Sequence, residues 1–274
     1  MKKLITLLSL FLSLGAFAQN THTLIYKMEP GTSYRYLREN SVTATQEMAG
    51  NEMTVTADTR NLTEYLTGEV TSDGRIVLMA KTLEASAHTN MMGKDTTVQL
   101  TDEIGKSEKT EMTLHGKPVK GNSEDSTKAV ATGFDIGAMN QSDFMKLPVN
   151  PVAMGEKWVV NEADTVKNDE IDIIVTTVTS SELTGTESRN GHDCLKVTFK
   201  TTYEINGKMK QYGMEMFIEG EGNSDGAYWF DEGRGLLAGY EGVINQDVTI
   251  AITGQSQMTI PSSQVINQKI TLIE

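Results

Sequence analysis

The sequence has few of the residues that build covalent frameworks and catalytic centres. It holds one cysteine, Cys194, five prolines and four histidines in 274 residues. A single cysteine excludes an intramolecular disulfide, so the stability of the fold must come from its core and its sheet. Zinc needs three or four clustered ligands. The histidines are scattered without His-x-x-x-His spacing, which argues against a metal site, although His88 and His115 could meet across a hairpin.

Long apolar runs are missing after the first residues of the chain. Met1-Lys-Lys3 precedes an apolar run from Leu4 to Leu14 and the small-x-small pattern Ala16-Phe-Ala18. This combination predicts a signal peptide over residues 1–18, cleaved after Ala18, because the run is too short for a permanent membrane-spanning helix. No cysteine lies beside Ala18 to carry a lipid anchor. We therefore expect a soluble exported product, periplasmic or secreted, with no transmembrane segment.

Basic residues are also in short supply. The chain has 24 Lys and Arg against 37 Asp and Glu, a formal net charge of −13. Losing Lys2 and Lys3 with the leader leaves 22 basic against 37 acidic residues, a net charge of −15. Nucleic acid and anionic membrane surfaces are poor partners for such a protein, because the phosphate attraction that drives them would be reversed. We interpret the acidity as a means of staying soluble.

Helical periodicity is absent, and alternation with period two takes its place. The clearest strand runs from Leu195 to Ile205, with apolar residues on one face and charged or polar residues on the other. It follows Asn190-Gly191, a pair that favours a type I′ hairpin turn. Further strands are predicted at 23–27, 34–45, 53–65, 76–80, 112–114, 158–166, 171–180, 211–219, 228–231, 238–253 and 265–273.

Polar clusters punctuate these strands. The stretches Gly121–Ser126 and Gly220–Gly226 are rich in Gly, Asn, Ser and Asp, which predicts turns. Only Asp143–Leu147 is a candidate for a short helix, with Ser142 as its N-cap and Pro148 as its stop.

The stretch from Leu147 to Trp158 looks like the seam of a duplication. Pro148 and Pro151 predict an extended connector. Gly155 and Trp158 then repeat the spacing of Gly31 and Tyr34 at an offset of 124. Three further landmarks recur at an offset of 117: Leu66-Thr-Gly68 with Leu183-Thr-Gly185, Asp73-Gly-Arg75 with Asn190-Gly-His192, and Gly116-Lys-Pro-Val119 with Gly233-Arg-Gly-Leu236.

These patterns predict an all-β fold of two similar antiparallel β-meander halves with few short helices. The expected division is a signal peptide at 1–18, an N-terminal half at 19–146, a connector at 147–157 and a C-terminal half at 158–274. Hairpins imply antiparallel sheets, since parallel pairs need crossover helices. Each half must bury one face, as a curved half-barrel around a ligand, a sandwich or a barrel.

Two sets of side chains are candidates for a ligand or partner surface. Tyr212, Met214, Met216 and Ile218 share one face of a predicted strand, and adaptable thioethers suit an apolar groove as well as an ordinary core. The run Tyr228, Trp229 and Phe230, joined by Trp158, would mark a carbohydrate or partner surface if exposed and a structural core if buried.

Catalytic patterns are weak. Ser224 lies in a Gly-x-Ser-x-Gly motif, but all four histidines precede it, whereas an α/β-hydrolase elbow uses a later one. Cys194 falls on the polar register of its strand, where it could be partly exposed, and has only His192 nearby as a base, so an inert strand cysteine is the favoured interpretation. Asp231 with Glu232 is the one carboxylate pair worth inspecting for a hydrolase. Acidic turns around Asn223–Asp225 offer calcium ligands without the EF-hand pattern, so no catalytic residue, metal or cofactor is predicted.

The sequence resembles an uncharacterised family of exported bacterial β-rich proteins, a domain of unknown function. Four features carry the resemblance: the leader, the opening at Gly31 and Tyr34, the seam from Pro148 to Trp158, and the run Trp229-Phe-Asp-Glu-Gly-Arg-Gly235. That resemblance implies no reaction. More loosely, a leader followed by long antiparallel strands is similar to periplasmic half-barrel carriers of lipoproteins. The first hypothesis is a non-catalytic protein that binds an apolar small molecule, a lipid or an extended ligand. The alternatives are a structural or protein-interaction module of the cell envelope and, more remotely, a hydrolase with paired carboxylates.

Overall fold

The all-β prediction is confirmed. A computed structural model describes residues 20–48, 50–91, 93–119, 143–211, 214–253 and 257–273. These ranges contain strands and no helix. The predicted signal peptide lies outside them, as do Ser142 and the Gly121–Ser126 turn. No helix in the described part of the chain is long and apolar enough to cross a membrane.

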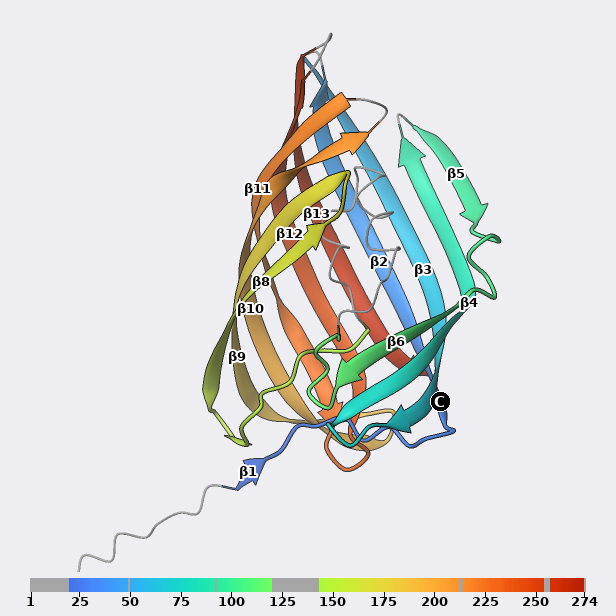
Figure 1. Ribbon diagram of the computed structural model, residues 1–274, viewed down its shortest axis with the longest axis vertical. Helices are drawn as coiled ribbons and strands as arrows, with labels where there is room; N and C mark the ends of the chain where they lie inside the picture. Colours follow the sequence, from blue (N-terminus) through green and yellow to red (C-terminus); the bar gives the residue numbers. More distant parts are fainter. Residues whose placement is uncertain are drawn as a thin grey trace, which may run out of the picture.

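One large antiparallel sheet dominates the molecule (Figure 1). Its eleven strands follow the order β5-β4-β3-β2-β13-β12-β11-β10-β9-β8, and β6 pairs with β4 beside β5. The bounds are β2 Ser33–Met48, β3 Asn51–Val70, β4 Arg75–Met91, β5 Lys94–Gln99, β6 Ser107–Thr113, β8 Lys157–Lys167, β9 Ile171–Arg189, β10 His192–Gln211, β11 Met214–Asp231, β12 Leu236–Thr253 and β13 Met258–Ile273. A separate pair joins β1 (Thr21–His22) to β7 (Val152–Ala153).

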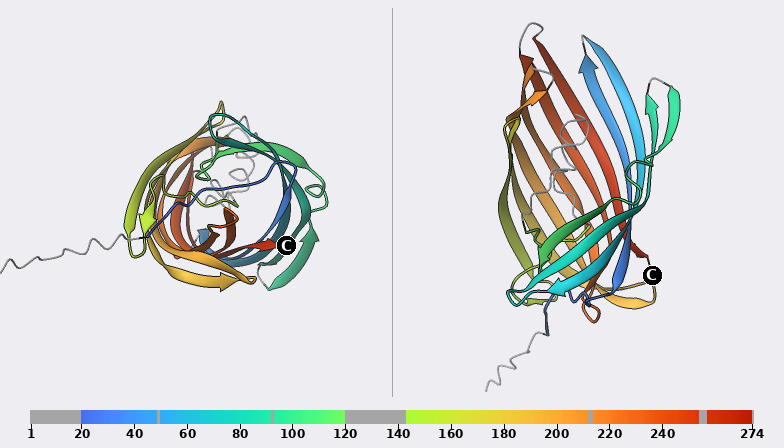
Figure 2. Two further views of the ribbon diagram at one scale, coloured as in Figure 1. Left: turned by 90° about the horizontal axis from the view of Figure 1, so that it is seen from below. Right: turned by 45° about the vertical axis from the view of Figure 1, so that its right-hand side comes forward.

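The sheet curves into an open half-barrel. β13 pairs with β2, from Ser262↔Gln46 to Ile273↔Arg35, so the two halves of the chain form one continuous sheet. Seen from below in Figure 2, the strands curve around an interior. Buried apolar side chains form the main core at its base. At the two ends of the strand order, β8 and the β5/β6 side make no backbone ladder with each other among the described residues.

β10 shows why the sequence forms long strands. Leu195, Val197 and Phe199 are buried on the inner face of the sheet, whereas Lys200 and Glu204 project outward. The Asn190-Gly191 turn that precedes the strand has φ values of 50° and 79°. Positive φ at both central positions is what a type I′ turn requires, so this hairpin prediction is confirmed.

The glycine-rich stretch Gly220–Gly226 is not a turn, as the sequence predicted, but the middle of β11. Gly222 and Gly226 lie under aromatic rings of the neighbouring strand. A Cβ on Gly222 would lie 2.4 Å from the Tyr203 ring, and one on Gly226 would lie 3.0 Å from the Phe199 ring. The missing side chains therefore let large rings lie flat against a strongly curved sheet.

The N-terminal segment closes the lower end of the half-barrel. Residues 23–31, predicted in part as a strand, instead cross the interior opening as an irregular segment (blue in Figure 2, left). The Tyr26 N–H donates to the Leu114 carbonyl at 2.8 Å, and the Lys27 N–H donates to the Gly235 carbonyl at 3.0 Å. Tyr26 is almost fully buried among the rings of the main core.

The predicted helix Asp143–Leu147 is also wrong. These residues form an irregular segment, which we name the strap. Its backbone groups bond to distant parts of the chain: the Leu147 N–H donates to the His115 carbonyl at 2.9 Å, and the Tyr26 hydroxyl donates to the Met145 carbonyl at 3.1 Å. The backbone of this segment therefore bonds to distant residues and not to residues four positions away, as it would in a helix.

Each half of the chain contains an equivalent pair of backbone hydrogen bonds. Gly31 donates to the Thr67 carbonyl at 2.8 Å, and Gly155 donates to the Leu183 carbonyl at 2.7 Å. In return, Thr67 donates to Thr32 at 2.9 Å and Leu183 donates to Glu156 at 3.1 Å. The offset at the glycines is 124, and at Thr67 and Leu183 it is 116, one residue short of the sequence landmark. These contacts favour a duplication, which stays a proposal.

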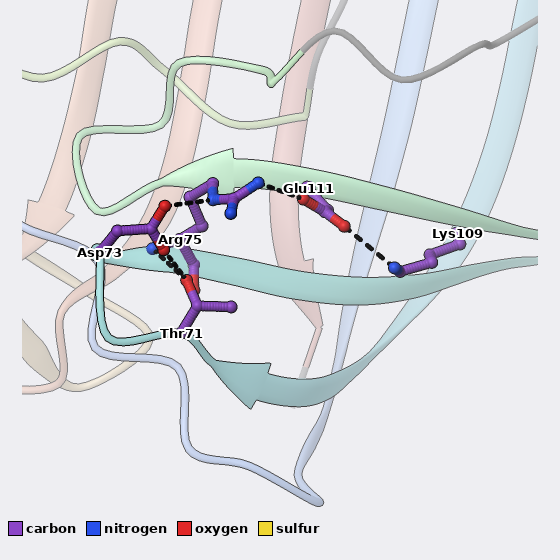
Figure 3. Close-up of polar contacts among 5 residues, drawn as sticks. All are labelled: Thr71, Asp73, Arg75, Lys109 and Glu111. Carbon is purple, nitrogen blue, oxygen red and sulfur yellow. Dashed lines mark hydrogen bonds and ion pairs between the residues drawn. The ribbon is translucent and has the colours of Figure 1, made fainter.

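The turn before β4 differs from its predicted counterpart. The Thr71 N–H bonds to the Arg75 carbonyl, and Gly74 has a φ of 76°, which gives a longer loop than Asn190-Gly191. Figure 3 shows how side chains hold it: Asp73 accepts from the Thr71 hydroxyl and from Arg75, and Glu111 joins Arg75 to Lys109. The Thr71 hydroxyl bond, with Arg75 beside it, lowers the pKa of Asp73. The Lys109 ammonium likewise lowers the pKa of Glu111.

Candidate functional site

The inner face of the sheet changes in character from its base to its upper rim. The base is an apolar core of aromatic and aliphatic side chains that includes Tyr36, Tyr228, Phe230 and Ile270. Strand register aligns the next levels across the sheet, because directly paired residues of adjacent strands share a face. One row runs Ala44–Gln264–Gln246–Gly222–Tyr203. The row above it runs Gln46–Ser262–Val248–Gly220–Ile205.

Buried and partly buried polar side chains therefore form a band across the middle of the inner face, which we name the polar belt. It consists of Gln46, Tyr203, Gln246, Ser262, Gln264 and Gln268. The Tyr203 hydroxyl donates to Gln246 Oε1 at 2.9 Å, and Gln246 Nε2 donates to Gln264 Oε1 at 2.7 Å. Within the described chain, the buried Ser262 hydroxyl has no hydrogen-bond partner, and the same holds for Asn40 Oδ1 one strand away.

Above the polar belt lies a second apolar cluster, which we name the upper cluster. Its buried members are Ile171, Ile173, Ile205, Met209, Met216, Ile218 and Val248. Val175, Ile250 and Ile252 pack against it while keeping partial exposure. Met214, Met216 and Ile218 lie on this inner face of β11, as the period-two pattern predicted. Tyr212 lies outside the described residues.

The outer face has the opposite polarity. Along β10 it carries Lys196, Lys200, Glu204 and Lys208, and neighbouring strands add further exposed acids and hydroxyls. Antiparallel sheets with one apolar and one polar face cover the first and leave the second in water. The inner face is therefore the side on which an apolar ligand would be held.

The strap fixes the two sides of the half-barrel to each other. At one end, Asp143 is buried and accepts from Arg38 Nε at 2.8 Å and from the Tyr65 hydroxyl at 2.5 Å. At the other end, the Lys146 ammonium contacts the carboxylates of Glu162 and Asp164 on β8. These six side chains join β2 and β3 to β8 through the strap, where the described residues form no backbone ladder.

Burial strongly affects the tyrosines beneath the strap. Desolvation, with the Asp143 charge as the second cause, raises the pKa of Tyr36 and of Tyr65. Burial also raises the pKa of Tyr240 to about 12, an effect that Arg38 partly offsets. These phenols therefore stay neutral at all physiological pH values and do not act as bases.

The predicted aromatic surface is buried. Tyr228 and Trp229 are each 3% exposed and Phe230 is fully buried, so of the two interpretations of this run the structure has the buried one. Tyr228 and Phe230 belong to the main core, and Trp158 is half-buried against it. Trp229 lies on the outer face, where the Arg189 guanidinium stacks 3.6 Å above its ring and its indole N–H donates to Glu187 at 3.0 Å.

Cys194 is also fully buried, so the partial exposure that its register allowed is not found and the interpretation as an inert strand cysteine is favoured. It is on the outer face, as predicted, but Trp229 and Ala238 cover it. Its thiol donates to the His192 carbonyl at 3.6 Å, and burial followed by the Asp231 charge raises the thiol pKa. A neutral, covered thiol has neither the base nor the access of a nucleophile.

The carboxylate pair does not converge on a cleft. Burial opposes ionisation of Asp231, but the backbone N–H and guanidinium of Arg234 outweigh it, so the pKa of Asp231 is lowered. Glu232 instead binds His22 Nδ1 at 2.8 Å and the Thr23 N–H at 3.0 Å. A general acid needs a raised pKa, and the environment of Asp231 lowers it instead.

The metal candidates do not cluster. Among the described residues no group of three or more His, Cys, Asp or Glu side chains could hold a metal ion. His88 pairs with the Thr97 hydroxyl at 2.9 Å on the sheet edge, whereas His115 lies beside the strap. Ser224 is in the middle of β11, not on a strand-to-helix elbow.

A separate groove of about 470 Å³ crosses the outer face from β13 to β5. Glu39, Asp58, Arg60, His88 and Lys269 contribute its charged groups. Arg60 already pairs with Glu39 at 3.1 Å and with Glu84 at 3.5 Å. Because these charges neutralise each other, the groove offers no clear preference for one class of ligand.

Comparisons with known proteins assign no family. No family model matches the chain, and no curated protein matches it. Among solved structures, OccK2 (OpdF) of Pseudomonas aeruginosa in complex with glucuronate has a TM-score of 0.30 and 6% identity, over 90% of this chain and 100% of that one. OccK2 alone has a TM-score of 0.28 and 7% identity, over 89% and 99%. An outer membrane channel from Pseudomonas putida F1 has a TM-score of 0.27 and 8% identity, over 91% and 98%.

TM-scores this low carry no argument about the fold or the function of this chain. None of the three proteins is a periplasmic lipoprotein carrier. The resemblance to an exported β-rich family and the looser one to half-barrel carriers therefore remain predictions from the sequence.

Proposed function

We propose that the chain is a non-catalytic, exported binding protein that holds an apolar or amphipathic small molecule, such as a lipid, on the inner face of its curved sheet. One observation carries the proposal: the inner face combines the upper cluster of apolar side chains with a polar belt that includes the Ser262 hydroxyl, which has no hydrogen-bond partner among the described residues. Ligand pockets are mostly apolar, with a few polar groups that orient the ligand. An apolar chain against the upper cluster and a polar group at the belt would satisfy both.

Two free-energy terms would favour binding of such a ligand: the relief of buried polar groups that have no partner, and the burial of the ligand's methylene groups. A buried acceptor or donor without a partner costs about 1–3 kcal/mol, and each buried methylene of a ligand contributes about 0.8 kcal/mol. Asn40 Oδ1 and Ser262 Oγ would both gain from a ligand with hydroxyl, amide or carboxyl groups. A purely aliphatic molecule would leave them unchanged.

Titration with a fatty acid that carries an environment-sensitive fluorophore tests this proposal. We expect saturable binding that weakens at least tenfold in Met214→Lys, because Met214 lies at the rim of the inner face and is 41% exposed. Phe217→Lys is the matched control, since Phe217 is on the outer face of the same strand and is 45% exposed. Equal losses in both variants, or no binding by the wild type, would refute the proposal.

The alternative of an interaction module has one observation in its favour. Val159, Ile174 and Val178 are 59%, 45% and 42% exposed on the outer face of β8 and β9, at the end of the strand order. Exposed apolar side chains beside an unpaired strand edge favour association with another protein. Light scattering of the purified protein and of Val159→Lys tests this alternative. A concentration-dependent oligomer that dissociates in Val159→Lys would support the interaction module.

A further inference from the structure

Three buried polar side chains lie together where β2 pairs with β13, and we name them the junction group. They are Gln46, Ser262 and Gln264, which are 8%, 7% and 4% exposed. Gln46 is directly paired with Ser262, and Gln264 follows two positions later on the same face of β13. Residues in such positions have neighbouring side chains on one face of a sheet. The junction group is therefore a compact part of the polar belt.

The hydrogen-bonding capacity of the junction group is only partly used. Gln264 Oε1 accepts from Gln246 Nε2 at 2.7 Å, and the amide N–H groups of Gln264 remain as donors. Within the described chain the buried Ser262 hydroxyl has no partner, although a serine hydroxyl can both donate and accept. Buried polar groups are normally hydrogen-bonded. The junction group is therefore suited to a ligand atom that both accepts and donates a hydrogen bond.

Charged side chains are scarce around the junction group. Its two rows cross the sheet from β3 to β8, and Glu162 and Asp164, at the β8 end, are the charged side chains among the described residues of these rows. Both carboxylates contact the Lys146 ammonium. These rows therefore offer no cation to a ligand. A ligand carboxylate at Ser262 would be buried without a counter-ion, which costs far more than burying a neutral hydroxyl.

An apolar surface begins beside the same group. Ser262 is directly paired with Val248, a buried member of the upper cluster. Ile250 and Ile252 continue the inner face of β12 beyond Val248 and keep partial exposure. Each methylene of a ligand that is buried there raises its affinity about fourfold. A head at Ser262 thus places a hydrocarbon chain along the upper cluster.

We propose that the junction group selects the head of the ligand. It binds an uncharged amphiphile whose head carries a hydroxyl, such as a long-chain alcohol or a monoacylglycerol, in preference to a fatty-acid anion. The ligand hydroxyl accepts from the Gln264 amide and donates to the Ser262 oxygen. This selectivity rests on the proposed binding function and narrows its class of ligand.

Competition between oleyl alcohol and oleate at alkaline pH tests the selectivity, because the two molecules differ only in the head and the carboxyl is ionised. The protein is equilibrated with phosphatidylcholine vesicles that contain both in equal amounts, and the ligand it takes up is extracted and quantified by mass spectrometry. We expect the alcohol to exceed oleate at least about tenfold in wild type, because the anion is buried without a counter-ion.

Two variants separate selection by the junction group from a general preference of an apolar site for a neutral molecule. Ser262→Ala should lower uptake of the alcohol about fivefold, the effect of one net hydrogen bond. It should not lower the urea midpoint of the unloaded protein, since the hydroxyl has no partner there to lose. Gln46→Lys supplies the missing cation and should reverse the preference in favour of oleate.

Ser263→Ala and Thr45→Lys are the matched controls, because Ser263 and Thr45 are paired on the opposite, outer face of the same two strands. Both should leave the ratio of alcohol to oleate unchanged. A preference for the alcohol that Ser262→Ala leaves intact would overturn the inference, and so would equal uptake or an excess of oleate in wild type. Uptake of neither molecule by wild type would instead refute the proposed function.

Discussion

Replacing Asp143 with alanine tests whether the strap holds the half-barrel together. The Asp143 carboxylate is buried, and it accepts from Arg38 at 2.8 Å and from Tyr65 at 2.5 Å. Removing one member of a buried ion pair costs about 3–5 kcal/mol, because the remaining charge loses the attraction that offsets its desolvation. The Arg38 side chain keeps 20% exposure, so water recovers part of this loss and we expect about 3 kcal/mol.

Urea unfolding at neutral pH measures the free energy of unfolding of wild type and of Asp143→Ala. A loss of about 3 kcal/mol also lowers the melting temperature by about 6–12 °C, at about 2–4 °C per kcal/mol for a protein of this size. Asp143→Asn should cost less, since its amide oxygen still accepts a hydrogen bond. In a double-mutant cycle with Arg38→Met, the second substitution should add little to the first. The reasoning is refuted if Asp143→Ala costs less than about 0.5 kcal/mol, the range expected of the exposed control Asp102→Ala.

Three further outcomes are expected. Gly222→Ala would bring a Cβ within 2.4 Å of the Tyr203 ring, so urea denaturation should show a loss of about 1–3 kcal/mol from overpacking. The Cys194 thiol is fully buried with a raised pKa, so an aromatic disulfide reagent should label it only after unfolding; rapid labelling of the folded protein would contradict its burial. The pKa of Asp231 is lowered in the folded state, so its stabilising effect is complete above about pH 4 and is lost as the pH falls through the folded value. Asp231→Asn should accordingly flatten the acid limb of a plot of urea midpoint against pH, and an unchanged limb would contradict the pairing with Arg234.

The features that could be predicted from the sequence are those set by a few neighbouring residues. The type I′ turn at Asn190-Gly191 and the inner face of β10 follow from two residues and from alternation alone. Gly220–Gly226 was predicted as a turn because its glycines are turn formers in isolation. In the sheet they are strand residues, since the rings of Tyr203 and Phe199 occupy the space of their absent side chains.

The strap shows why the candidate site was largely missed. Asp143 and Arg38 are 105 positions apart, and no local pattern pairs them. The polar belt was also not predicted, although Gln264 and Gln268 share the apolar register of the last strand. Two buried amides on the apolar register of a strand are a signal that a closer reading could have used. The pairing of β2 with β13 joins the two ends of the chain and has no local signature either.

Native mass spectrometry of the exported protein tests the central claim, that the inner face holds an apolar or amphipathic ligand, most directly. Protein expressed with its leader and sprayed from aqueous buffer should carry an adduct that organic extraction removes and that added fatty acid restores. The Met214→Lys protein should carry less of it than Phe217→Lys. A bare polypeptide mass in every sample, with no uptake of fatty acid by the wild type, would contradict the account.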